Sequence, residues 1–91
     1  MDGIGAMTAV QFHVNEVFDL AARGGLIAVG STLNGEFVGI PRLRDDASGR
    51  PIHVLGVDHP TPRTRRSGET ILVVDRADAD YVQPGRLWTQ E

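Results

Sequence analysis

The sequence predicts an all-β protein, a small antiparallel β-barrel of six or seven strands. Apolar and polar residues alternate with a period of two along several segments, which is the pattern of half-buried strands. Glycine and proline turn signals separate these segments at intervals of about ten residues, as in small barrels and sandwiches. Helical periodicity is not sustained anywhere beyond a single turn.

The first expected strand starts at Thr8, and apolar residues occupy its even positions from Val10 to Val14. A bend or bulge near Asn15–Glu16 explains why the alternation breaks there. The alternation then resumes at Phe18 and Leu20.

The next expected strand is the apolar, β-branched run Leu26–Leu33, which follows a turn at Ala21–Gly25. Asn34–Gly35 is a strong hairpin signal because both residues tolerate positive φ. It predicts a short returning strand at Phe37–Ile40, which Pro41 either ends or confines to a sheet edge.

The second half of the chain reads as loops, two further strands, one helical turn and a closing strand. In chain order we expect a polar loop at Arg44–Arg50, a strand at Ile52–Val57, an irregular proline-rich segment at His59–Gly68, a strand at Thr70–Val74, a stretch at Asp75–Tyr81 that can hold one helical turn, a turn at Gln83–Gly85 and a closing strand at Arg86–Thr89.

Size and composition are those of one globular domain. The chain has 91 residues, of which 41% are hydrophobic and 23% charged, and domains run to about 100–150 residues. We expect one barrel over residues 8–91 after a flexible, glycine-rich start at residues 1–7. Either Met1 or Met7 fits as the native start.

Two missing residue types exclude several kinds of chemistry. Without cysteine there is no disulfide, thiolate zinc site or cysteine nucleophile. All nine basic residues are arginine, so Schiff-base catalysis and a P-loop lysine are excluded as well. The formal charge of −3 does not indicate a polyanion binder. The start has no signal-peptide pattern, and the longest apolar run, Leu26–Val29, is far short of the ~20 residues of a membrane span. We therefore expect a cytoplasmic protein.

Several motifs occur in a familiar order: Phe18–Leu20, Arg23–Gly25, Gly30 with Gly35 five residues later, Gly68–Val74, and Asp78–Leu87. This order resembles the domain II β-barrel of elongation factor Tu and related translation GTPases, over most of the chain from Val17 to Trp88. Two departures are Gly39, one residue early, and Ile40–Pro41 in place of the family's aspartate and the residue after it.

The resemblance implies a barrel that stands alone, without the GTPase domain against which domain II packs in that family. In the elongation factor Tu branch, domain II also helps to hold the aminoacyl end of tRNA, but no residue here matches a tRNA-contact motif. The matching positions are turn glycines and strand positions. We therefore expect six structural glycines: Gly24, Gly25, Gly30, Gly35, Gly68 and Gly85.

The first candidate partner-binding residues are Arg63, Arg65 and Arg66, in a loop that also contains Pro60 and Pro62. Three guanidinium groups on a restricted loop suit phosphate oxygens of RNA or an acidic protein surface. Such an RNA contact would be weak and salt-sensitive, and the loop has no aromatic residue for base stacking. The other interpretation is a solvated loop kept soluble by arginine.

The second candidate partner-binding residues are the aromatic Phe37 and Trp88. Tryptophan is enriched at interface hot spots, although a lone tryptophan on a closing strand also commonly covers a barrel end. A short edge near Phe37–Val38 would favour pairing with a second copy, so a homodimer is also considered.

Catalytic, metal and cofactor sites are not expected. The candidate metal ligands are three histidines and three aspartates: His13, His53, His59, Asp75, Asp78 and Asp80. There is no His-x-His pair, and the acids depart from the EF-hand spacing, so we interpret them as turn and helix N-cap residues.

Nucleophile and nucleotide motifs are missing in the same way. None of the serines, Ser31, Ser48 and Ser67, lies in a Gly-x-Ser-x-Gly elbow. The glycines Gly24, Gly25 and Gly30 do not form a dinucleotide fingerprint.

The leading hypothesis is a non-enzymatic binding module for a protein or ribonucleoprotein partner, with no cofactor. The alternative is a structural or oligomerising module, such as a homodimer, without a small ligand. A small hydrolase is the third hypothesis.

Overall fold

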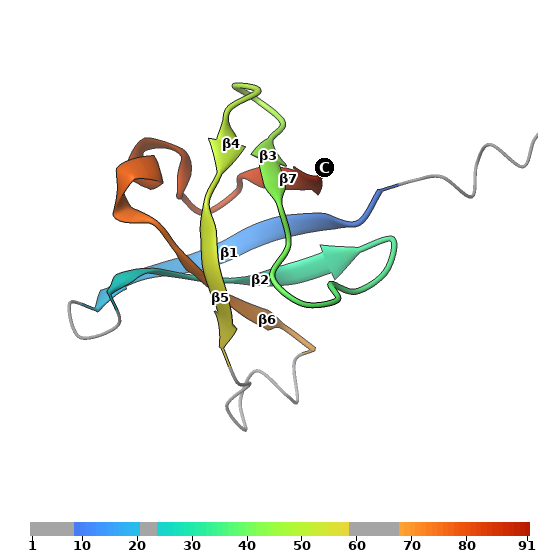
Figure 1. Cartoon of the computed structure of the whole chain (residues 1–91), viewed down its shortest axis with the longest axis horizontal. Helices are drawn as coiled ribbons and strands as arrows, with labels where there is room; N and C mark the ends of the chain where they lie inside the picture. Colours follow the sequence, from blue (N-terminus) through green and yellow to red (C-terminus); the bar gives the residue numbers. More distant parts are fainter. Residues whose placement is uncertain (1–8, 21–23, 59–67) are drawn as a thin grey trace, which may run out of the picture.

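The structure, a computed structural model, describes residues 9–20, 24–58 and 68–91. Within these residues the chain is all-β, as predicted (Figure 1). The elements in chain order are β1 (Gln11–Leu20), β2 (Gly25–Leu33), β3 (Leu43–Asp45), β4 (Pro51–Ile52), β5 (Val54–Asp58), β6 (Thr70–Val74), the 3-10 helix η3 (Arg76–Tyr81) and β7 (Leu87–Gln90). The seven described strands form one antiparallel sheet in the order β4-β3-β7-β1-β2-β6-β5.

A single kinked segment closes this sheet into a barrel. The two strands at the ends of the sheet order, β4 and β5, are consecutive in the chain, and only His53 separates them. The first part of the segment pairs with β3 and the second with β6. Figure 1 shows this segment crossing in front of β1 and β2. The predicted strand at Ile52–Val57 is therefore two short strands that belong to opposite ends of the sheet.

Strand β1 contains the predicted bulge. Val14 pairs with Gly30 and Glu16 with Val29, so Asn15 is the extra residue. One inserted residue exchanges the faces of all following side chains. As a result Val17 packs against the core, whereas Phe18, expected to share the face of Val14, is 41% exposed.

The core lies between the walls of the barrel. Its aromatic centre is Trp88, whose ring stacks on Phe12 with centroids 5.7 Å apart. Phe37 packs against the same Phe12 ring at 6.1 Å. The buried residues of this core are Phe12, Val14, Leu26, Ala28, Leu43, Ile52, Leu72, Val74, Val82 and Trp88.

A second, smaller apolar cluster occupies the other face of β2 and β6. It contains the buried Ile27, Val29 and Ile71, with Val73 packed against them. Side chains alternate between the two faces of a strand, so these odd-numbered residues point away from Ala28 and Leu72 of the core.

The predicted strand at Phe37–Ile40 is wrong. This segment has no regular secondary structure, and the chain re-enters the sheet only at β3, which overlaps the start of the polar loop expected at Arg44–Arg50. Strand β1 pairs along the whole of β2, and β6 pairs with Leu26–Gly30 on the other edge. A returning strand could therefore have reached only the last three residues of β2. The other late elements agree with expectation, because β6 covers Thr70–Val74 and η3 supplies the short helix.

The six glycines expected to be structural each have a local reason to lack a side chain. Four have positive φ: Gly24, Gly35, Gly68 and Gly85. The other two lie where chains approach closely. A Cβ on Gly25 would lie 2.6 Å from the carbonyl oxygen of Val74, and one on Gly30 would lie 2.1 Å from that of His13.

Candidate binding groove

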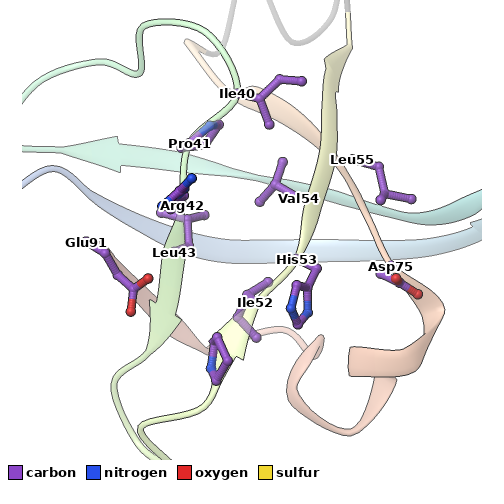
Figure 2. Close-up of a pocket in the computed structure, with 11 residues that line it drawn as sticks. Ile40, Pro41, Arg42, Leu43, Ile52, His53, Val54, Leu55, Asp75 and Glu91 are labelled. Carbon is purple, nitrogen blue, oxygen red and sulfur yellow. The ribbon is translucent and has the colours of Figure 1, made fainter.

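A groove of about 530 Å³ opens beside the short β4–β5 segment that closes the barrel. One wall is the segment of residues 40–42 that leads into β3, and the other is the kinked segment of β4 and β5 (Figure 2). The apolar side chains that line it are Ile40, Pro41, Leu43, Pro51, Ile52, Val54 and Leu55. In Figure 2, Val54 lies on the groove side of β5, whereas Leu55 points away from it.

The groove exists because β3 and β4 pair at only two positions. Leu43 pairs with Ile52 and Arg44 with Pro51, and beyond these pairs the two walls separate. On the far side of the first wall, the carbonyl oxygen of Arg42 accepts a hydrogen bond of 2.8 Å from the Glu91 backbone. On the far side of the second wall, β5 pairs with β6. In each wall, the backbone edge that does not make these hydrogen bonds faces the groove.

Helix η3 holds the kink at His53 in place. The carboxylate oxygen Oδ2 of Asp78 accepts the backbone N–H of His53 at 2.8 Å and lies 3.0 Å from its Nδ1. The backbone N–H of Asp75 donates to the carbonyl oxygen of His53 at 2.9 Å. Asp78 is buried, whereas the side chain of His53 is 64% exposed. The two hydrogen bonds to the backbone of His53 hold the angle between β4 and β5.

Asp75 also caps the helix, since its side chain accepts a hydrogen bond from the backbone of Ala77 at 2.9 Å. The expectation that these aspartates serve turns and caps is confirmed for Asp75. Asp78 has a longer-range function, because its partner His53 is 25 residues away in sequence.

Replacing Asp78 with alanine is expected to destabilise the fold by about 1–3 kcal/mol, because the backbone N–H of His53 loses its acceptor. Asp78→Asn is the matched control, since its amide oxygen can still accept that hydrogen bond. Urea unfolding of the two variants and the wild type measures the difference. Equal losses in both variants would show that the charge, rather than the acceptor, matters.

Most charged side chains of the groove are already paired. Glu91 forms an ion pair of 2.5 Å with Arg44, and Asp75 and His53 are engaged as described. Arg42 is exposed and has no side-chain partner among the residues that the structure describes. The guanidinium of Arg42 is thus available to a ligand in the groove.

A polar network lies at the bulge of β1. The Nδ2 of Asn15 donates to Ser31 Oγ at 3.2 Å and to Glu69 Oε2 at 2.9 Å, and Asn15 Oδ1 lies 2.8 Å from His13 Nδ1. The Ser31 hydroxyl is therefore held by an amide, which cannot act as a general base. The network anchors the extra residue of the bulge. Among residues 9–20, 24–58 and 68–91 no three metal-binding side chains come together.

Of the predicted partner-binding residues, the two that the structure describes, Phe37 and Trp88, do not line this groove. Trp88 is fully buried, so the prediction of a surface contact through it is wrong: its ring fills the core beside Phe12. Phe37 is half-buried against the same ring and contributes mainly to the core. Arg63, Arg65 and Arg66 lie outside the described residues.

Sequence reasoning missed the groove residues themselves. Ile40 and Leu55 were expected in ordinary strands. Asp78, which holds the kink beside the groove, was expected only as a turn or N-cap residue. One local signal was present, since Pro41 precedes β3 and Pro51 is the first residue of β4, and proline limits how far strands can pair.

In the described part of the chain there is no helix with the length and apolar character needed to cross a bilayer. Comparisons with family models, with curated proteins and with solved structures gave no match to this chain.

Proposed function

We propose that this chain is a non-enzymatic binding module that takes a protein partner in the groove between residues 40–42 and β5. The order of its glycine and strand motifs resembles that of domain II of the translation GTPases. The observation that carries the proposal is the groove itself, with apolar side chains on both walls. Ile40, at 61% exposure, is among the most exposed large apolar residues described.

A binding function fits the groove better than catalysis does. Catalysis needs an acid, base or nucleophile positioned to react. Here His53 is held by Asp78, Asp75 caps η3 and Glu91 pairs with Arg44. These contacts use the polar groups for structure and leave the apolar surface for contact.

A protein partner fits better than RNA. Binding of single-stranded nucleic acid combines a positively charged groove with aromatic stacking platforms. The residues that line this groove include one unpaired arginine, Arg42, and no aromatic side chain other than the imidazole of His53. Aliphatic walls are instead suited to aliphatic side chains of a protein.

The test is affinity capture from a lysate of the source cells, with the full chain as bait. We expect the wild type to capture a protein that is retained after ribonuclease treatment. The variant Ile40→Asp should lose it, because a carboxylate would then stand on the apolar wall. Leu33→Asp is the matched control: Leu33 is 42% exposed but does not line the groove.

The captured protein is then purified and titrated against all three chains. Binding that weakens at least tenfold for Ile40→Asp and is unchanged for Leu33→Asp supports the proposal. Capture that disappears with ribonuclease would point to RNA instead. Capture of the chain's own copies alone would identify an oligomerising module, and either result would contradict the proposal.

A further inference from the structure

We infer that the groove takes an extended peptide segment of the partner, which pairs with the free edge of β5 and completes the barrel wall. This inference rests on the proposed function and specifies the form of the partner. The segment would carry apolar side chains at alternating positions and one carboxylate opposite Arg42.

The edge of β5 is suited to strand addition. Among the described residues, β5 is the last strand of the sheet order and pairs with β6 alone. Its other backbone edge therefore faces the groove and can offer N–H and C=O groups to an added strand. Proteins usually protect such edges with prolines or charges. In β5 the first four residues are Val-Leu-Gly-Val, and Asp58 is the only charged one of the five. Leu55 and Val57 are 50% and 43% exposed, and only the bulge at Leu55 interrupts the edge.

The two walls favour a single extended chain over a second copy of this barrel. A strand in the groove would have β5 on one side and residues 40–42 on the other. In a second copy, one edge of β5 is already paired with β6. That strand therefore cannot pair with both walls of the groove at once. A segment that is extended and unpaired before binding has both edges available.

The lining determines which side chains the segment should carry. Ile40 and Val54 present accessible aliphatic surface toward the groove, whereas Ile52 is buried in the core beneath it. Successive side chains of a strand point to opposite faces. Apolar residues are therefore expected at every second position. Arg42 lacks a partner in the described part of the chain, and a guanidinium pairs well with a carboxylate.

The probe is a display library of random twelve-residue peptides, selected on the immobilised full chain. Selected peptides are synthesised and their affinities measured for the wild type, Ile40→Asp and Leu33→Asp. We expect alternating apolar residues with an acidic one, binding that is lost in Ile40→Asp only, and at least fivefold weaker binding to Arg42→Ala.

Two readouts report strand pairing and leave the protein unmutated. Amide hydrogen exchange should slow at least tenfold, when the peptide binds, at the residues of Val54–Val57 whose N–H groups point toward the groove and not toward β6, because these groups become bonded. N-methylation of the peptide should weaken binding at least tenfold at alternate positions, those whose N–H groups face β5, and less at the positions between.

The outcomes separate this inference from the function on which it depends. Peptides that bind without slowing exchange in β5, or that tolerate N-methylation everywhere, overturn strand addition. A captured partner that needs the groove while no peptide binds there also overturns it, and leaves the protein-binding function standing. If neither protein nor peptide binding responds to Ile40→Asp, both proposals fail.

Discussion

Replacing Trp88 with alanine should cost the protein about 3–5 kcal/mol of stability, the largest effect expected of a single core truncation here. Trp88 is fully buried and stacks on Phe12 in the aromatic centre of the core. Its strand, β7, pairs with both β1 and β3, so the cavity would lie where three strands meet. Urea unfolding followed by far-ultraviolet circular dichroism measures the loss. The substitution removes the single tryptophan, and fluorescence therefore cannot be used.

Trp88→Phe provides the matched comparison. The indole Nε1 of Trp88 is buried with no hydrogen-bond partner among the described residues, and an unpaired buried donor reduces stability. Phenylalanine keeps much of the ring and removes that donor, so its loss should be less than half of the alanine loss. A Trp88→Ala loss below about 1 kcal/mol would contradict the position of this ring in the core.

Replacing Gly30 with alanine should destabilise the barrel by about 3 kcal/mol, at the upper end of the usual cost of overpacking. The added Cβ would lie 2.1 Å from the carbonyl oxygen of His13 and 2.7 Å from the ring of Phe12. The first of these neighbours is backbone, which cannot rotate away, so β1 would have to move from β2 beside its bulge. Urea unfolding gives the magnitude of the loss.

Gly56→Ala is the control for this substitution. Gly56 also lies in a strand, but a Cβ there meets no atom within 4 Å. The change should alter stability by no more than about 0.5 kcal/mol. Similar losses at both positions would mean that the general preference for glycine, and not the contact with β1, determines the effect.

Local sequence patterns predicted those elements whose conformation depends little on residues distant in sequence. Strand β6 agrees with Thr70–Val74 because an apolar, β-branched run bounded by polar residues has few alternatives. The bulge in β1 was visible because Glu16 interrupts the alternation. Its consequence for Phe18 was missed, since the extra residue shifts the register as well as bending the strand.

The errors arose where a residue's environment depends on distant partners. A strand at Phe37–Ile40 was consistent with a hairpin at Asn34–Gly35. However, β6, which begins only at Thr70, pairs with Leu26–Gly30 on the edge of β2 along which that strand would have continued. Trp88 was considered an interface anchor because tryptophan is enriched at interface hot spots. Its burial follows from pairing with Phe12 and Asp45, which no local pattern around residue 88 indicates.

The sequence by itself therefore determined the fold class, the approximate positions of most strands, the glycines at turns and close approaches, and the chemistries that cannot occur without cysteine and lysine. These follow from side-chain periodicity and backbone preferences, which are local properties. The tertiary structure alone decided the order of strands, the kink at His53 held by Asp78, and the groove between residues 40–42 and β5. Those features depend on which strand edges remain unpaired once the sheet has closed, and that is a property of the whole chain.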